Sequence, residues 1–287
     1  MSEARVAVIG GSGLYNMKGM EGVREVHVDT PFGRPSDAII LGKLEGVSTA
    51  FLPRHGRGHH LMPTEVPSRA NIYALKTFGV EQVISVSAVG SLREEMRPGD
   101  LVVVDQLIDR TRLRPSTFFG DGIVAHVSFA DPFCPILRGR LVQAAREVGA
   151  DVHDGGTCVA MEGPAFSTRA ESHLYRSWGA HVIGMTALPE AKLAREAEMC
   201  YATLACVTDY DCWREATEAV TVDVVLEVLR KNVALSQDVL RRAVPNLPEK
   251  RECACPTALQ NAIVTARDSV PEVTRRRLAP IIGKYLT

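Results

Sequence analysis

Apolar runs with the length of β-strands alternate with helix-like segments along most of this 287-residue chain. Residues 6–9, 82–88 and 157–161 have the continuous apolar character of buried strands, whereas 68–78 and 135–148 have the pattern of helices. Strands that alternate with helices assemble into a mostly parallel sheet whose two faces are covered by the helices. The sequence therefore predicts an α/β fold, a single domain with a central, mostly parallel mixed sheet flanked by helices.

The same alternation continues through the second half of the chain. Thr168 and Glu171 have the spacing of a capping box, which predicts that a helix begins there. Strand, helix, strand and long-helix patterns follow at 181–185, 189–198, 201–208 and 221–244. The composition shifts only at 245–256, and a last short helical segment comes after it. We therefore expect 1–287 to form one domain in which 245–287 is a C-terminal appendage.

The overall charge excludes two classes of partner. Thirty-three Lys and Arg residues balance 34 Asp and Glu residues, so the formal net charge is -1 and no global positive field would attract nucleic acid or an anionic membrane. No apolar run approaches the ~20 residues of a membrane-spanning helix. The segment 1–6 is too short and too polar to open a signal peptide. We expect a cytoplasmic protein with no nucleic acid or membrane partner.

The cysteines have the distribution of buried thiols. They are mostly inside apolar runs, at positions 134, 158, 200, 206, 212, 253 and 255. Cys253 and Cys255 form a Cys-x-Cys pair, which by itself is too isolated for a zinc site, because such sites usually use four ligands. We interpret the pair as structural thiols, with a redox or disulfide role as the alternative.

A glycine turn, Gly10-Gly11-Ser12-Gly13, follows the first predicted strand. Glycines at a strand exit let backbone N–H groups approach an anion, and Ser12 adds a hydroxyl donor. A dinucleotide fingerprint would need a third glycine at the start of a helix, and both are missing. A phosphate loop is therefore favoured over a nicotinamide or flavin site.

A second anion-binding pattern follows the strand-like run 49–52. Arg54, His55, Arg57, His59 and His60 fall within seven residues and are spaced by glycines. Arginine and histidine donors in a flexible loop suit phosphate. The alternatives are a metal site at two of the histidines, which the neighbouring arginines disfavour, and a surface loop with no ligand.

Two further strand ends carry candidate ligand contacts. Ser87 and Ala88 end a buried strand before a glycine, which leaves room for a ligand at the edge where α/β sheets bind them. Glu162 and Phe166 follow another strand and are suited to hydroxyls and to an aromatic base. The alternatives are an ordinary strand-exit turn at the first segment and, at the second, a turn capped by Ser167.

The most specific motif is Thr208-Asp209-Tyr210-Asp211, at the end of an apolar strand. If the segment is extended, Asp209 and Asp211 point to the same side. Two carboxylates on one face repel unless they meet donors or share a proton. An exocyclic amine and a protonated ring nitrogen would satisfy both requirements. The alternative is a pair of solvated aspartates.

Together these motifs resemble the methylthioadenosine phosphorylases, which belong to the trimeric branch of the purine nucleoside phosphorylase superfamily. The resemblance extends from about residue 5 to about residue 244, with many motifs in the same order. It is carried by residues 10–13, 54–59, 91–95, 98–100, 109–111, 131–135, 162–164, 185–186 and 208–213.

The resemblance implies the fold of the nucleoside phosphorylases and the phosphorolysis of S-methyl-5'-thioadenosine. The products would be adenine and 5-methylthioribose 1-phosphate. Phosphate is then a co-substrate, and neither a cofactor nor a metal is expected. The residues that the resemblance assigns to phosphate are Ser12, Arg54, His55, Ser87, Ala88 and Thr186.

The resemblance also assigns contacts to the nucleoside. Asp209 and Asp211 are implied to be catalytic, because they bind the purine N7 and the 6-amino group. Met185 is implied to lie against the ribose. Phe166 and Ser167 are expected beside the base.

The 5'-methylthio group is implied to lie against an apolar helix face. Val222, Val225 and Leu226 match that face, and His126 of a neighbouring subunit is implied to complete the pocket. A pocket shared between subunits implies a homo-oligomer, either a trimer or a dimer of trimers.

The chemistry of the predicted groups agrees with this assignment. The glycosidic bond breaks through an oxocarbenium-like state, which a phosphate anion stabilises, and a hydrogen bond or proton at N7 improves the leaving group. Three other functions stay open: a purine nucleoside phosphorylase of broader specificity that accepts adenosine, inosine or methylthioinosine, a nucleoside-binding protein without catalysis, and a dinucleotide oxidoreductase. Carboxylates suit a 6-amino group and so disfavour a strictly 6-oxopurine enzyme.

Overall fold

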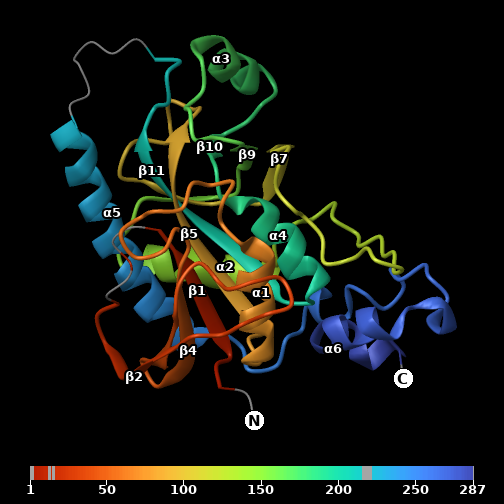
Figure 1. Ribbon diagram of the computed structural model, residues 1–287. Coiled ribbons are helices and arrows are strands. Elements are labelled where there is room, and N and C mark those ends of the chain that lie inside the picture. The colour runs from red at the N-terminus through yellow and green to blue at the C-terminus, as the bar shows by residue number, and fades with distance from the viewer. Residues whose placement is uncertain (1–2, 12–13, 15–16, 215–221, 287) are drawn as a thin grey trace.

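A large twisted sheet forms the centre of the computed structural model, which describes residues 3–11, 14, 17–214 and 222–286 (Figure 1). The strands of this sheet are β1 (Val6–Gly10), β2 (Met20–Val26), β3 (Ile39–Leu44), β4 (Val47–Pro53), β5 (Gln82–Ser91), β6 (Leu101–Val103), β7 (Gln106–Arg110), β8 (Val152–Asp154), β9 (Thr157–Met161), β10 (Val182–Gly184) and β11 (Cys200–Asp209). The helices are α1 (Ser68–Thr77), α2 (Pro135–Glu147), α3 (Arg169–Ser177), α4 (Ala187–Glu196), α5 (Val222–Ala243) and α6 (Glu272–Leu286).

The sheet is mixed and mostly parallel, as predicted. Its strands follow the order β2-β3-β4-β1-β5-β10-β9-β7, while β11 pairs with β5 and β6, and β6 also pairs with β8. Within the described part of the chain, six of the ten strand pairings are parallel. The four strands β4, β1, β5 and β11 run parallel to one another, so their carboxyl ends meet at one edge.

Both faces of the sheet are buried under helices, which explains the continuous apolar runs of its central strands. Ala7 and Ile9 of β1 belong to the apolar cluster on the face of α1, α4 and α6. Val6 and Val8 belong to the cluster on the opposite face, with α2 and α5. Successive residues of a strand point to opposite faces, so an unbroken apolar run fills two cores.

Most predicted elements are present, and the capping box is confirmed. The Thr168 hydroxyl accepts from the Glu171 N–H, and the Glu171 carboxylate accepts from the Thr168 N–H. The sequence patterns missed β2, β3, β7 and β8. No residue of β2, β7 or β8 is fully buried, so these three strands lack an apolar run that would reveal them. The apolar run Ile39-Ile40-Leu41 of β3 was an available signal.

The last 43 residues, 245–287, are held against the sheet at several places. Arg5 donates to the carbonyl of Pro248 at 2.8 Å, and Arg251 donates to the carbonyl of Glu198 at 2.7 Å. Further on, the His126 N–H donates to the carbonyl of Ala262 at 2.8 Å. The segment ends in α6, which is longer than the short helix predicted there and packs against α1. In the described part of the chain, no helix combines the length and apolarity required to cross a membrane.

Candidate active site

The site lies where the parallel strands β1, β4, β5 and β11 end. The hydrogen-bonded register sets Gly10 beside both Pro53 and Val86, and sets Asp209 beside Gly90. The next residues along β1, β4 and β5 are therefore neighbours in space although they are distant in the sequence. Ligands of α/β sheets bind beyond the carboxyl ends of such strands, and Gly10 at the end of β1 leaves room for them.

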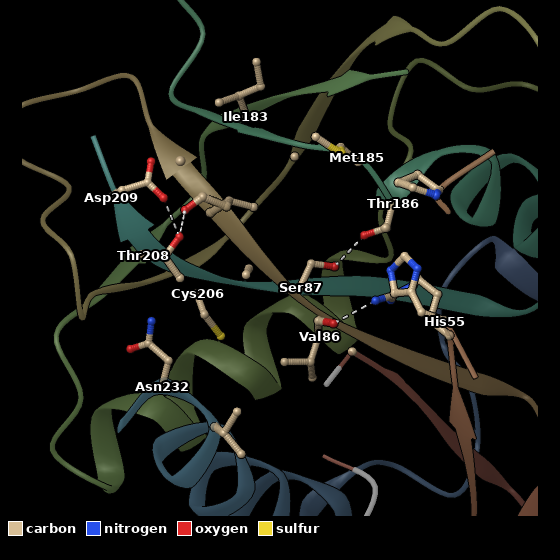
Figure 2. Close-up of a pocket in the computed structure, with 18 of the residues that line it drawn as sticks. His55, Val86, Ser87, Ile183, Met185, Thr186, Cys206, Thr208, Asp209 and Asn232 are labelled. Carbon is tan, nitrogen blue, oxygen red and sulfur yellow. Dashed lines mark hydrogen bonds between the residues drawn. The ribbon is translucent and has the colours of Figure 1, made fainter. Parts of the chain in front are cut away.

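A cavity of about 390 Å³ opens at these strand ends (Figure 2). It brings together most of the residues expected to bind phosphate and nucleoside. The predicted residues that line it are Arg54, His55, Ser87, Ala88, Phe166, Met185, Thr186, Asp209 and Asp211. Its lining is mainly apolar between two polar ends, which suits a ligand with a charged part and a flat aromatic part.

At one end, two hydroxyl groups converge from different elements. Ser87 Oγ of β5 lies 3.0 Å from Thr186 Oγ1, which immediately precedes α4 (Figure 2). Both hydroxyls are small donors that can turn from each other toward a bound anion. Sequence reasoning expected both residues to contact phosphate, and the fold places them side by side.

His55 borders the same end of the cavity. Its Nδ1 lies 2.9 Å from the carbonyl oxygen of Leu61, so Nδ1 carries the proton and donates it to this carbonyl. The ring of His59 stacks on it, with 4.3 Å between the two centroids. Burial lowers the pKa of His55 to about 4. The ring is therefore neutral near pH 7, and its Nε2 can accept a hydrogen bond from a phosphate hydroxyl.

Arg54 lines the cavity, but its guanidinium also has strong partners inside the protein. It is only 1% exposed, and its Nε lies 2.5 Å from Glu190 Oε1. It also donates to Ser85 Oγ at 2.7 Å and to the carbonyl of Val86 at 3.0 Å. Because the buried Glu190 carboxylate compensates this cation, Arg54 fixes the wall of the cavity.

Glu190 was not predicted by the sequence analysis. It is 1% exposed in α4, and Tyr201 donates to its Oε2 at 2.9 Å. An available signal was its place in the apolar stretch 187–191, where an acidic residue needs a buried partner. The sequence pattern gave no means of identifying that partner as Arg54.

The two aspartates form the other polar end of the cavity. Thr208 Oγ1 donates to Asp209 Oδ2 at 2.7 Å, and the Asp211 N–H donates to Asp209 Oδ1 at the same distance. Burial raises the pKa of Asp211, and the charge of Asp209 adds to this effect. The Asp209 carboxylate, with its two fixed donors, therefore lies beside a carboxyl group that holds its proton more tightly than usual.

The extended conformation expected for this segment was wrong. The strand β11 ends at Asp209, and Asp211 has a φ of 50°, in the left-handed region. A turn rather than strand periodicity therefore brings the second carboxyl group to the cavity.

Two glycines provide the space that these side chains occupy. A Cβ on Gly90 would lie 3.1 Å from Asp209 Oδ1 and 3.3 Å from Asp211 Cβ. Gly163 has a φ of +69°, and a Cβ there would lie 2.5 Å from Met185 Sδ. A side chain at Gly90 would therefore push both aspartates from their positions by a few tenths of an ångström, and one at Gly163 would force the Met185 side chain to move.

Two residues predicted near the ligand have other contacts. The carboxylate of Glu162 pairs with Arg114, at 2.9 Å between Oε1 and Nε, and is not part of the cavity lining. The expectation that it faces a ligand was wrong, because the strand-end turn directs it toward this arginine. Ser167 does not line the cavity either, and its hydroxyl lies 3.7 Å from Met161 Sδ. Its neighbour Phe166 does line the cavity and is 84% exposed.

The remaining predicted residues lie outside the described part of the structure or border another cavity. Ser12 lies outside the described residues, as do the side chains of Val222, Val225 and Leu226, whose backbone belongs to α5. His126 is exposed and borders a different cavity of about 710 Å³.

The sequence analysis missed lining residues that a helix supplies. Asn232, Val233 and Ser236 of α5 lie along the cavity, together with Cys206 of β11. The Asn232 side chain donates to the carbonyl of Val207 at 2.9 Å. Polar residues inside the apolar stripe of a long helix were the available signal.

A mostly parallel sheet with hydroxyls and paired carboxylates at its strand ends is the arrangement expected of an enzyme that cleaves nucleosides with phosphate. The sequence profile of the phosphorylase superfamily matches residues 5–245 of this chain. The S-methyl-5'-thioadenosine phosphorylase of Geobacter sulfurreducens is 56% identical over 99% of this chain and 100% of its own length. The corresponding protein of Chloroflexus aurantiacus is 58% identical, with 99% of each chain covered.

Solved structures agree with these sequence relationships. A methylthioadenosine phosphorylase from an Antarctic soil metagenomic library has a TM-score of 0.92 and 52% identity, covering 98% of this chain and 99% of its own. A mutant adenosine/methylthioadenosine phosphorylase of Schistosoma mansoni, in complex with methylthioadenosine, has a TM-score of 0.81 and 37% identity, covering 94% and 99%. The chain belongs to the S-methyl-5'-thioadenosine phosphorylase family.

We predict that Glu190→Gln strongly destabilises the fold, because it leaves the buried Arg54 cation without its counter-charge. Removing one partner of a buried ion pair costs about 3–5 kcal/mol of unfolding free energy. Denaturant unfolding of both proteins measures this difference. Glu272→Gln is the matched control, because the ion pair of Glu272 with Arg276 is exposed and contributes about 0–1 kcal/mol. Equal small losses for the two variants would contradict the prediction.

Proposed function

We propose that this chain cleaves S-methyl-5'-thioadenosine with phosphate, yielding adenine and 5-methylthioribose 1-phosphate. The observation that carries the proposal is that one cavity joins the two hydroxyls and His55 at one end to the aspartate pair at the other. Full-length relatives named for this activity support it. Phosphate acts as co-substrate, and we propose that the reaction needs no resident cofactor.

We propose that phosphate binds between Ser87, Ala88, Thr186 and His55, with Arg54 behind them and Ser12 contributing from the glycine turn. The two hydroxyls can donate to phosphate oxygens, and the neutral His55 can accept from the hydroxyl of a monoprotonated phosphate. An anion held beneath the sugar stabilises the oxocarbenium-like state as the glycosidic bond breaks. Phosphate then attacks the anomeric carbon.

We propose that the aspartate pair binds and activates the base. The donors of Thr208 and Asp211 hold the Asp209 carboxylate in place. The raised pKa of Asp211 favours a proton on the pair, which can be shared with N7 of the purine as the bond breaks. An ionised oxygen accepts a hydrogen bond from the 6-amino group. Phe166 contacts the base, Met185 contacts the ribose, and Ser167 stays a predicted contact at the edge of the base.

We propose that the 5'-methylthio group lies against Val222, Val225 and Leu226 of α5. His126 of a neighbouring subunit completes this subsite, so the active form is a homotrimer or a dimer of trimers.

The phosphorylase domain spans 1–287, with 245–287 as its appendage, which agrees with the end of the superfamily match at residue 245. A cytoplasmic location and the absence of nucleic acid and membrane partners stay predictions from the sequence.

The defining experiment follows adenine release from S-methyl-5'-thioadenosine by the purified protein, with and without phosphate. We expect release only with phosphate, because the hydroxyls and His55 are arranged for an anion, and faster release than from adenosine, inosine or methylthioinosine. Release without phosphate would identify a hydrolase and contradict the phosphate site. Equal rates with all four nucleosides would favour a purine nucleoside phosphorylase of broader specificity.

We predict that Asp209→Asn lowers turnover of S-methyl-5'-thioadenosine by about 100-fold or more, because the amide lacks the negative charge that helps Asp211 to hold a proton and that balances a protonated N7. Selectivity for 6-amino over 6-oxo purines should also weaken, because an amide can donate to a 6-oxo group. Steady-state kinetics with both nucleosides measure the two effects. Asp151→Asn, which changes an exposed residue before β8, is the control. Kinetics unchanged by Asp209→Asn would show that the base is bound elsewhere.

The shared subsite predicts that His126→Ala raises the KM for S-methyl-5'-thioadenosine several-fold, although His126 does not line the cavity of its own chain. Light scattering of the wild-type protein should give the mass of a trimer or hexamer. His153→Ala is a control for histidine removal at a site distant in the sheet, where His153 pairs with Asp100. A fully active monomer would refute the shared pocket.

A further inference from the structure

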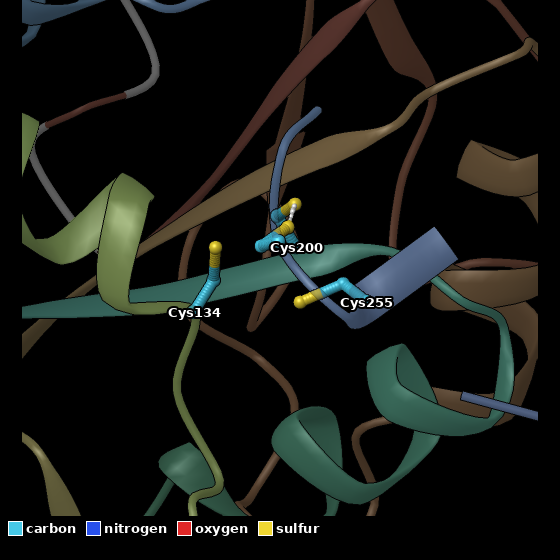
Figure 3. A group of neighbouring side chains, drawn as sticks. Cys134, Cys200 and Cys255 are labelled. Atoms are coloured by element: carbon cyan, nitrogen blue, oxygen red, sulfur yellow. Dashed lines mark hydrogen bonds between the residues drawn. The ribbon is translucent and has the colours of Figure 1, made fainter. Parts of the chain in front are cut away.

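Four cysteines from three distant parts of the sequence converge at the opposite end of β11 from the candidate active site (Figure 3). Cys134 immediately precedes α2, Cys200 begins β11, and Cys253 and Cys255 belong to the C-terminal appendage. Their four Sγ atoms all lie within 4.8 Å of one another. The prediction that the Cys-x-Cys pair is isolated was therefore wrong, because the fold adds two further thiols to it.

The backbone fixes the positions of these thiols. The Cys134 N–H donates to the carbonyl of Tyr201, and the Cys200 N–H donates to the carbonyl of Glu81, both at 2.9 Å. On the appendage, the Ala258 N–H donates to the carbonyl of Cys255 at 3.3 Å. Cys134, Cys200 and Cys255 are therefore held by main-chain hydrogen bonds, and Cys253 lies in the bend that precedes Cys255.

The spacing fits a single ion. Zinc bound by four thiolates has Zn–S distances of about 2.3 Å, so the sulfurs of a tetrahedron are roughly 3.8 Å apart. Cys200 Sγ and Cys253 Sγ lie 3.4 Å apart, which is close to this value and well beyond a disulfide bond of about 2.05 Å. A four-iron cluster would hold its cysteine sulfurs further apart, because the atoms of the cluster stand between them.

The surroundings fit a closed structural site. Cys134, Cys200 and Cys255 are buried in the cluster that joins α2 and β11 to the appendage. Cys253 is half-buried and borders the cavity of about 710 Å³, which gives an ion a path from solvent. Ordinary buried thiols pack as small apolar groups and need not point at one another. Convergence of all four indicates a soft metal ion.

We propose that Cys134, Cys200, Cys253 and Cys255 bind one zinc ion in a tetrahedral site that ties the C-terminal appendage to the sheet. Each thiol releases its proton to solvent as its sulfur binds the metal, with no change of oxidation state. All four positions hold protein ligands, so none is open for a substrate, and the role is structural. The proposal does not depend on the phosphorylase reaction.

The position of the ion has a consequence for the segment that carries His126. Beyond Cys255, the appendage pairs with this segment through the Val264 N–H, which donates to the carbonyl of Val124 at 2.9 Å, and through the carbonyl of Ala262. The zinc site would therefore anchor the appendage shortly before the residues that pair with the segment 124–126. Arg251 and Leu259 also bond to Glu198, so the appendage keeps some attachment when the metal is removed.

The first test measures the metal content of the full-length protein purified under reducing conditions. We expect about one zinc per chain, retained on gel filtration. After removal of the zinc with a strong chelator, the thermal midpoint should fall, and added Zn²⁺ should restore it. Co²⁺ added instead should give the visible absorption of a tetrahedral tetrathiolate site. Metal-free protein that binds neither ion would overturn the proposal, and stoichiometric iron in place of zinc would overturn the assignment to zinc.

The second test uses variants and needs no activity measurement. Cys134→Ser and Cys253→Ser should each lose most of the bound zinc, whereas Cys158→Ala should retain it. Cys158 is the matched control, because it is buried in β9 outside the group of four. Zinc retained in both serine variants would contradict the site. If these variants fail to fold, the metal content and the cobalt spectrum of the wild-type protein still decide whether the site exists. Disulfides among the four cysteines in freshly purified, unreduced protein would also overturn the proposal.

Discussion

The register of the four parallel strands β4, β1, β5 and β11 is the constraint on which the rest of this structure depends. Main-chain hydrogen bonds align Gly10 with Pro53 and Val86, and align Asp209 with Gly90. A slip of one residue would turn every side chain of a strand to the other face and would separate the strand ends. The apolar clusters on both faces oppose such a slip, so core packing and site geometry are fixed together.

The buried network around Arg54 and Glu190 adds rigidity directly beside the cavity. Burying two charges is costly unless each is fully hydrogen-bonded, and here Ser85, Tyr201 and main-chain carbonyls complete the pair. The network links β4, β5, α4 and β11, which are the same elements that carry the residues proposed to bind phosphate and base. Stability and positioning of the proposed site therefore rest on the same contacts.

The two ends of β11 have separate roles in this account. Its carboxyl end places Asp209 at the cavity, while its first residue, Cys200, belongs to the thiol group at the appendage. The appendage in turn contacts the segment that carries His126, the residue proposed to reach a neighbouring subunit. A metal at the thiol group would thus stabilise the appendage and the segment of His126 without touching the reacting atoms.

The sequence by itself determined the fold class, the capping box of α3 and nine of the residues that line the cavity. These features follow from local patterns, because apolar runs, glycine turns and strand-end motifs are encoded by neighbouring residues. Only the tertiary structure decided the Arg54–Glu190 pair, the turn that presents Asp211, the contact of Glu162 with Arg114 and the meeting of four cysteines. Each of these joins residues far apart in the chain or depends on a single backbone angle. Such contacts leave no periodic trace in the sequence, because strand register and helix packing create them.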